Sequence, residues 1–375
     1  MAKADGHNEQ WKTIKLGDDD LFDFVKGEQI NGDLLSDNGQ FPMYNGGTEP
    51  SGYLEQFNTH ENEIIMSEGG NSCGYVNYVT TKFWRGGHCY LVRLCKENSF
   101  DKLFVYYLLK FHEENLMKLR VGSGLPNIQK KDLFKYIISY PDSLPAQRRI
   151  AAILSAADKV IEQTRQLIGK YKSIKQGMME DLLKPKEGWK MVRLGDCCIT
   201  ELGKTLDEGR NTGEYRPYLC ALNVLWGKID RTTIKQMRIE DDELNRYAVK
   251  RGDLLVCEGG EIGRCAIWDY DDTMYYQNAL HRVRFFNGYD SMFFMYLLCY
   301  YNDLNLLEQH GKGLTIKHLN QTSFRSIPVS VPDLSEQRRI AKILSGIDRK
   351  IEAEEKVLEK YEKMKKGLME RLLNE

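Results

Sequence analysis

The sequence lacks several features that would assign the chain to a class at once. Its 53 Lys and Arg nearly balance 54 Asp and Glu, so it is not a uniformly basic nucleic-acid coat, although local basic patches stay open. The longest strongly apolar run, Met292–Tyr301, is about half of the ~20 residues that a membrane span needs. The initial segment MAKADGHNEQ has no apolar core of a secretory signal. We therefore expect a cytoplasmic protein with no membrane contact.

Metal-binding and catalytic patterns are also missing. None of the nine cysteines forms a CxxC pair, and no two of the seven histidines lie three or four residues apart, so we expect free thiols and no metal site. Gly203-Lys204-Thr205 is similar to the end of a phosphate-binding loop, but Cys198 stands where that motif needs its first glycine. Pro332-Asp333 is similar to the start of a nuclease motif, but no Glu-x-Lys pair follows, so we interpret Asp333 with Glu336 as a capping box. We expect no catalytic residue.

An internal repeat is the most informative feature that the sequence does contain. Residues 147–183 (QRRIAAILSAADKVIEQTRQLIGKYKSIKQGMMEDLL) align without a gap to residues 337–373 (QRRIAKILSGIDRKIEAEEKVLEKYEKMKKGLMERLL), with about half of the positions identical. Glu68-Gly69-Gly70 recurs as Glu258-Gly259-Gly260, but the segments before these motifs differ in length and do not align. The chain is thus a duplicated unit, a globular part followed by a long helix, whose two copies contain different inserts.

The patterning predicts an α+β fold of two tandem α/β domains, each followed by a long helix. Strands are expected at 64–66, 90–92, 254–256 and 327–331, and shorter helices at 101–119 and 290–307. The expected segments are a first domain at 1–143, a central helix at 144–184, a second domain at 185–333 and a final helix at 334–375.

Both long helices have the seven-residue apolar period of a coiled coil, broken by Thr164 and Lys175 in the first copy and by Glu354 and Lys365 in the second. Parallel pairing would oppose Lys175 and Lys365. We therefore predict an antiparallel pair with a pseudo-twofold axis, in a register that opposes Lys175 with Glu354. The predicted interface comprises Ile161, Ile168, Tyr171, Lys175, Met178, Ile351, Glu354, Leu358, Tyr361 and Leu368.

Basic, amide and glycine residues of the globular halves are candidates for DNA contact. Arg, Lys, Asn and Gln side chains read base edges, and glycine lets backbone amides approach phosphates. Tight turns and solvated surface groups are the alternative interpretation of each single residue. The candidates are Gly69, Gly70, Lys82, Arg85 and Ser123 in the first half and Arg264, Gln277, Asn278, Arg282, Lys312 and Lys317 in the second.

Together these features make the whole chain resemble the specificity subunits of Type I restriction–modification systems. The resemblance rests on the two QRRIA-led helices, on their entries YPDSLPAQRRI and VPDLSEQRRI, and on segments such as FPMYNGGTEPSGY and DLLVCEGGEIGRCAIWDY. It implies two target-recognition domains, each of which reads one half of an asymmetric bipartite sequence in double-stranded DNA. It also implies a helix pair that acts as a spacer and docks two modification subunits.

The resemblance further implies that S-adenosylmethionine, ATP and magnesium belong to partner subunits. These are the modification subunits, which methylate adenine, and two restriction subunits where a system has them. This chain would then bind no cofactor and would not be an enzyme. The alternative class is a non-catalytic coiled-coil scaffold whose globular halves bind proteins. The polar inserts rich in glycine and asparagine argue against that class.

Overall fold

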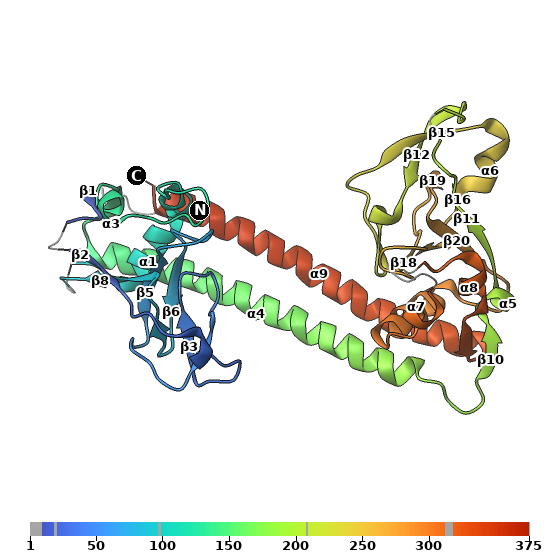
Figure 1. The fold of residues 1–375 in the computed structure, drawn as a ribbon, viewed down its shortest axis with the longest axis horizontal. Helices are drawn as coiled ribbons and strands as arrows, with labels where there is room; N and C mark the ends of the chain where they lie inside the picture. The colour runs from blue at the N-terminus through green and yellow to red at the C-terminus, as the bar shows by residue number, and fades with distance from the viewer. Residues whose placement is uncertain (1–9, 19–20, 97–98, 208, 312–317, 375) are drawn as a thin grey trace, which may run out of the picture. The chain divides into compact units, whose positions relative to one another are not determined.

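The computed structural model describes residues 10–18, 21–96, 99–207, 209–311 and 318–374. The chain divides into two compact units, of which the first is Met1–Arg165 with Lys356–Glu375 and the second is Gln166–Glu355. Each unit combines one globular part with one half of each long helix, α4 (Leu144–Leu183) and α9 (Leu334–Leu372) (Figure 1).

The globular part of the first unit is built on a four-stranded sheet in the order β2-β8-β5-β6. Its strands are β2 (Phe22–Lys26), β8 (Cys89–Leu94), β5 (Glu63–Ser67) and β6 (Val76–Val79). A second sheet contains β4 (Gly52–Leu54), β3 (Phe41–Tyr44) and β7 (Trp84–Arg85), and β1 (Trp11–Lys15) pairs with β9 (Ile137–Pro141). The helices are η1 (Gly32–Leu34), α1 (Lys102–Phe111), α2 (Glu113–Met117) and α3 (Lys130–Leu133).

The second unit repeats this frame. Its main sheet, β11-β20-β17-β18, contains β11 (Cys198–Leu202), β20 (Leu280–Phe285), β17 (Leu254–Cys257) and β18 (Cys265–Ile267), and β10 (Lys190–Arg193) pairs with β21 (Pro328–Val331). The insert differs, because it forms a four-stranded sheet of β15 (Lys235–Ile239), β12 (Glu214–Leu219), β19 (Met274–Tyr276) and β16 (Ala248–Val249), with a hairpin of β13 (Val224–Leu225) and β14 (Lys228–Ile229). The helices are α5 (Leu194–Cys197), η2 (Ala221–Asn223), η3 (Asp241–Glu243), α6 (Leu244–Tyr247), α7 (Ser291–Asp303), η4 (Leu307–His310) and α8 (Gln321–Ser326).

The duplicated α+β fold predicted from the sequence is therefore confirmed. The four predicted strands are present as β5, β8, β17 and β21. The two predicted shorter helices are interrupted: α1 ends at Phe111 before α2, and α7 ends at Asp303 before η4. The side chains of Asp101 and Asp290 cap α1 and α7 by accepting a backbone hydrogen bond 2.9 Å long from Phe104 and Phe293.

The repeated glutamine of the QRRIA motifs fastens each long helix to its globular part. Gln147 is fully buried; its Oε1 accepts from the backbone N–H of Asp101 at 2.9 Å and its Nε2 donates to the carbonyl of Pro141 at 3.0 Å. Gln337 repeats both contacts in the second unit, including a 2.9 Å bond from the N–H of Asp290. A buried amide satisfied in this way fixes the angle at which the helix leaves the sheet.

The ends of the long helices belong to the apolar cores of the globular parts. In the first unit the core includes the start of α4 and the residue after α9, namely Ile150, Ala151, Leu154 and Leu373. In the second unit it includes the end of α4 and the start of α9, namely Met179, Leu183, Ile340, Ala341 and Leu344. The compact units therefore differ from the four expected segments 1–143, 144–184, 185–333 and 334–375, because each helix is shared between two cores.

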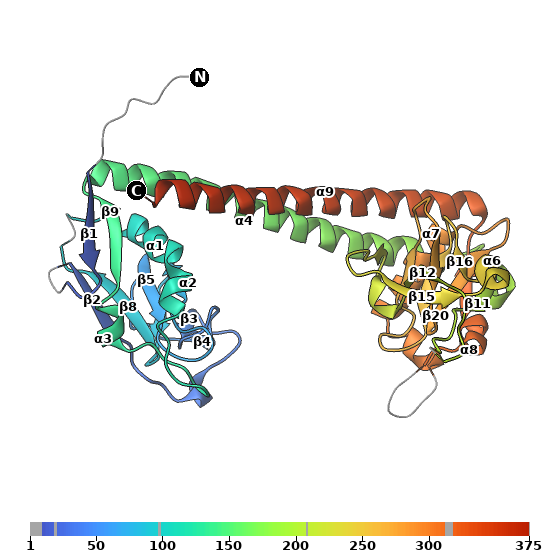
Figure 2. The same ribbon diagram turned by 90° about the horizontal axis from the view of Figure 1, so that it is seen from above.

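Within each unit the halves of α4 and α9 run antiparallel (Figure 2). All twenty predicted heptad core positions are buried or half-buried, including the ten interface residues named above. Ion pairs join Arg165 to Glu362 at 2.6 Å in the first unit and Lys172 to Glu355 at 2.9 Å in the second. The 190-residue offset of the repeat interchanges these two pairs, so each unit contains the counterpart of the other unit's ion pair.

The predicted register of the helix pair is wrong. Lys175 pairs with Asp348 at 2.7 Å rather than with Glu354, so its partner lies six residues nearer the start of α9. Lys365 pairs with Asp158 in the same way, and Thr164, which was expected opposite Lys365, donates to the carbonyl of its own helix at Val160.

The reason for this register lies outside the heptads. Tyr107 of α1 donates to Asp158 at 2.8 Å, and Tyr296 of α7 donates to Asp348 at 2.6 Å. The ammonium groups of Lys365 and Lys175 also lie over the rings of these tyrosines. Each lysine thus binds a carboxylate that a tyrosine of the globular part has already oriented.

One of the two hydrogen bonds of the capping box predicted at the start of α9 is present. Asp333 Oδ1 accepts a hydrogen bond from the backbone N–H of Glu336 at 3.0 Å. The Glu336 carboxylate, however, pairs with Arg339 at 2.6 Å one turn later. The nearby guanidinium is a stronger partner than a backbone N–H, because the bond joins two charged groups.

Candidate functional site

Glycine-rich loops of the first unit surround a cavity of about 510 Å³. Its lining includes the predicted candidates Gly69 and Gly70 together with Lys26, Asn45, Gly46, Gly47, Ser51, Glu68, His88, Leu125, Pro126 and Asn127. The carboxylate of Glu68 accepts from the hydroxyl of Tyr90 at 2.9 Å and is paired with Lys26, so it adds little uncompensated negative charge. The predicted candidate Ser123 is exposed in the adjoining loop.

The other two candidates of the first half are partly withdrawn from the surface. Lys82 is half-buried, with its ammonium 4.7 Å from the centre of the Phe57 ring. Arg85 donates to the carbonyl of Val25, and burial lowers the pKa of its guanidinium. Its Nε is buried and has no hydrogen-bond partner in the described structure. The structure thus places Arg85 at the base of the insert, where it joins β7 to β2.

In the second unit the candidates Gln277 and Asn278 lie beside the loop that begins at Gly203. Lys204 and Gln277 form a parallel bridge, and the N–H of Asn278 donates to the carbonyl of Lys204 at 3.0 Å. Both candidate side chains are half-buried, whereas Lys204 is buried in ion pairs with Glu240 and Glu243. The Gly203-Lys204-Thr205 segment therefore forms a β-bridge, not the turn expected from the sequence, and supports the loop of Gln277 and Asn278.

Two predicted arginines have structural roles instead. Arg282 is 3% exposed; it pairs with Glu201 and donates to the carbonyls of Arg246 and Ala248. It therefore cannot reach a ligand in this structure, and its assignment as a base-contacting residue is corrected. The sequence could not reveal this, because its carbonyl partners lie in the insert that the other half lacks.

Arg264 is half-buried and bridges the start of the same insert, donating to the carbonyl of Ala221 at 2.8 Å and to Glu261 at 3.2 Å. The last two predicted candidates, Lys312 and Lys317, lie outside the described residues.

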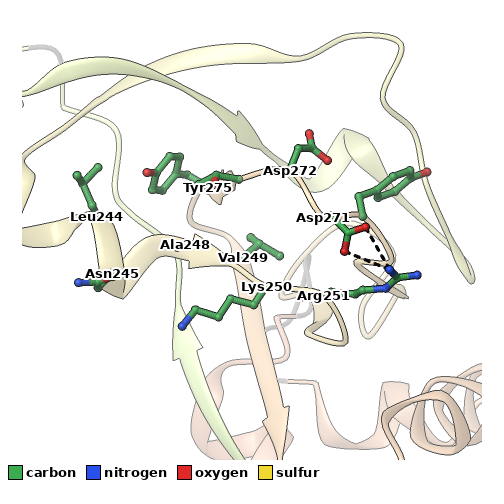
Figure 3. Close-up of a pocket in the computed structure, with 11 residues that line it drawn as sticks. Leu244, Asn245, Ala248, Val249, Lys250, Arg251, Asp271, Asp272 and Tyr275 are labelled. Carbon is green, nitrogen blue, oxygen red and sulfur yellow. Dashed lines mark hydrogen bonds and ion pairs between the residues drawn. The ribbon is translucent and has the colours of Figure 1, made fainter.

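A further polar cavity of about 360 Å³ lies in the insert of the second unit, beside β16 (Figure 3). Its lining includes Lys250, Arg251 and Tyr275. Arg251 turns toward Asp271, to which it is bound at 3.1 Å, and also binds Asp269 at 2.8 Å. Sequence reasoning missed this cavity, since the insert has no counterpart in the first half.

The helix pair has two unlike edges, formed by the heptad positions on either side of the core. One edge, which we call the ion-paired edge, contains Arg165, Glu362, Lys172 and Glu355, all at heptad position e. Asp158 and Asp348 also occupy position e, so α1 and α7 contact the helices on this edge.

The opposite edge, at heptad position g, is apolar; we call it the apolar edge. In the first unit it consists of four partly exposed residues, Ile153 (39%), Val160 (39%), Val357 (36%) and Met364 (52%). In the second unit the same positions hold Leu167, Ile174 and Ile343, with Lys350 in place of the fourth. The sequence shows these apolar residues at heptad position g, whereas the predicted interface included only positions a and d.

Among the described residues no group of three or more His, Cys, Asp or Glu side chains could hold a metal ion. In the same part of the chain, no helix is both long and apolar enough to cross a membrane.

Two copies of one α+β frame, each with its own insert and joined through paired long helices, define a class of duplicated proteins. The chain belongs to the family of Type I restriction modification DNA specificity domains, whose family model matches residues 8–170 and again 186–363.

Individual relatives agree with this assignment. The chain is 26% identical over 403 residues to the Type I restriction enzyme MjaVIII specificity subunit of Methanocaldococcus jannaschii, an alignment that covers 97% of this chain and 92% of that protein. It is 35% identical over 161 residues to a protein of Mycoplasma pneumoniae named as a type I specificity subunit, with 43% of this chain and 42% of that protein covered. The chain thus matches about two fifths of the length of this Mycoplasma relative.

Solved structures show the same fold. The crystal structure of the S subunit of a Type I restriction–modification system from M. genitalium superposes with a TM-score of 0.72 at 23% identity and covers 100% of this chain and 98% of that one. A chain from a study of complex assembly and conformational transition of the type I R-M system superposes with a TM-score of 0.59 at 14% identity, covering 97% of both.

Proposed function

We propose that this chain is the DNA sequence-recognition subunit of a Type I restriction–modification complex. In this proposal each globular part reads one half of an asymmetric bipartite sequence in double-stranded DNA. The observation that supports it is the combination of one shared frame with two different inserts, a three-stranded sheet in the first unit and a four-stranded sheet in the second. A repeated frame that holds two different inserts suits two different half-sites.

The proposal includes two modification subunits that dock on the helix pair. The apolar edge supports this, because each unit presents it once and the repeat relates the two copies. Exposed Ile, Val and Met side chains in a line seven residues apart are the pattern that accepts a partner helix. On the ion-paired edge, Tyr107 and Tyr296 already bind Asp158 and Asp348, and the remaining charges pair with each other, which leaves the apolar edge for the partners.

Chemistry is assigned to those partners in this proposal. The modification subunits would bind S-adenosylmethionine and methylate adenine, and restriction subunits, where the system has them, would use ATP and magnesium. This chain would bind DNA without a cofactor and act in the cytoplasm, where its DNA target and partners are found.

The test of this function is exchange of a recognition module in the assembled complex. Residues 17–141 are replaced by the equivalent segment of a relative with a known target, and the methylated adenines of the host are then sequenced. We expect one half of the methylated motif to change while the other half and the spacer stay the same. The reciprocal exchange of residues 195–332 is the matched control and should change only the other half. A change in both halves after a single exchange would contradict the proposal.

A further inference from the structure

The loop between Val121 and Asn127 presents an apolar side chain that no part of the described structure covers. Leu125 at its tip is 89% exposed, the highest value among the large apolar residues of the described chain. Burial of a leucine side chain is favourable, so its exposure does not contribute to the stability of the fold. Leu125 lines the cavity beside the Glu-Gly-Gly motif, where a bound ligand would cover it.

This loop is firmly held at its base. Val121 and Asn127 exchange two backbone hydrogen bonds of 2.8 and 3.0 Å, and the N–H of Gly70 donates to the carbonyl of Pro126 at 2.9 Å. The N–H of Ile128 donates to the carbonyl of Glu68 at 2.9 Å. The leucine is therefore presented on a support that is joined to the Glu-Gly-Gly motif and through it to β5.

Gly122 and Gly124 of this loop differ in whether the fold itself requires glycine. Gly122 has a φ of +105°, which a residue with a side chain rarely adopts. Gly124 has no such φ, and a Cβ added to it would meet no atom within 4 Å. The fold therefore does not require glycine at position 124. Close approach of the loop backbone to another molecule would require it.

The cavity beside Leu125 is lined by side chains that can contact a groove of DNA. Asn45 and Asn127 supply amide groups suited to base edges, and Lys26 and Glu68 neutralise each other in an ion pair, so the lining adds no net negative charge that would repel a phosphate. Apolar residues next to such groups, leucine and proline among them, act in other DNA-binding proteins as wedges that enter a base step and unstack it.

We propose that Leu125 is such a wedge: it enters the DNA at one base step of the half-site read by the first unit, while Asn45 and Asn127 face the adjacent base edges. This inference rests on the proposed function and adds a mechanism to it, since the first half-site would be selected partly by how readily that step unstacks. The repeated sequence Gly311–Leu314 extends outside the described residues, so the inference concerns the first unit.

The experiment uses the complete complex and duplexes that contain the methylated motif found by sequencing. 2-Aminopurine, whose fluorescence rises when it is unstacked, replaces one base at a time along the first half-site. For the wild type we expect a rise at one step on binding. Leu125→Ala should abolish the rise and weaken binding about tenfold, and Leu125→Met should keep both. The matched control is Ile137→Ala, an exposed apolar residue (55%) of the repeated frame in the same unit, which should behave as the wild type.

A second variant separates loss of folding from loss of the wedge. Gly124→Val should leave the thermal unfolding of the chain unchanged, because its side chain would meet open space, and should still weaken DNA binding. No fluorescence rise in the wild type, or an equal rise in Leu125→Ala, would overturn the wedge even if the complex methylates its motif. Failure of the complex to recognise any bipartite site would instead contradict the proposed function.

Discussion

Removal of Asp158 should destabilise the first unit far more than removal of an exposed member of the same helix pair. The Asp158 carboxylate binds the ammonium of Lys365 and accepts a hydrogen bond 2.8 Å long from the hydroxyl of Tyr107. Burial, and then the hydrogen bond to Asp158, raise the pKa of Tyr107, so its hydroxyl is protonated and donates. Asp158→Ala would leave a cation and a hydroxyl without their partner.

The magnitude follows from burial. Breaking a fully buried ion pair costs about 3–5 kcal/mol. The side chains of Asp158 and Lys365 are 36% and 19% exposed, so solvent screening reduces the expected loss to about 2 kcal/mol. The exposed pair of Arg165 (55%) and Glu362 (46%) in the same unit is the matched control, and Glu362→Ala should cost less than about 1 kcal/mol.

Urea unfolding at pH 7, followed by far-ultraviolet circular dichroism, measures both losses. A double variant, Asp158→Ala with Lys365→Met, should recover part of the stability because it leaves no unpaired buried charge. Asp348→Ala should reproduce the loss in the second unit, where Lys175 and Tyr296 form the same cluster. If Asp158→Ala cost no more than Glu362→Ala, the cluster would have no role in fixing the helix pair.

Three further outcomes are expected. Burial lowers the pKa of His281, whose Nε2 donates to a backbone carbonyl. As the pH falls through about 6.5, only the unfolded chain gains this proton, so the urea midpoint should fall between pH 7.5 and 5.5. The midpoint of His281→Gln should fall less over the same range. Arg282→Ala should lower thermal stability without relaxing the methylated motif, whereas Asn278→Ala should relax one base position by about 1–3 kcal/mol. Val160→Glu should reduce the modification subunits bound from two to one in native mass spectrometry, and Gln163→Glu, off the apolar edge, should not.

The elements predicted best are those that a regular spacing of apolar residues specifies. A period of seven over 37 repeated residues predicts two long paired helices, and short apolar runs such as 254–256 predict the strands. The register of the helix pair failed for a physical reason: heptad positions favour several registers almost equally, and Tyr107 and Tyr296 select among them from α1 and α7. No spacing in the sequence connects those tyrosines with the aspartates.

The candidate site shows the same limit. Lysine and arginine are expected to be exposed, yet Arg282 and Lys204 are 3% and 5% exposed. Carboxylates pair with both, and groups of the second insert supply two carbonyls to Arg282 and both carboxylates to Lys204. That insert has no counterpart in the first half, so comparison of the two copies could not reveal these contacts. The exposure of Leu125 could not be predicted either, because an exposed leucine has no signature in a sequence. Its exposure follows from a hairpin closed by Val121 and Asn127.

The places where the two copies agree and differ follow a single requirement, namely that two different readers be presented by one support. Gln147 and Gln337, the aspartates at 158 and 348 and the tyrosines at 107 and 296 all fix a long helix to its globular part, and each is identical in both copies. The inserts have no such contact to keep and have diverged to different sheets. A change of insert therefore leaves the helix pair and its apolar edge intact, which is the physical condition that the proposed exchange of a single DNA half-site requires.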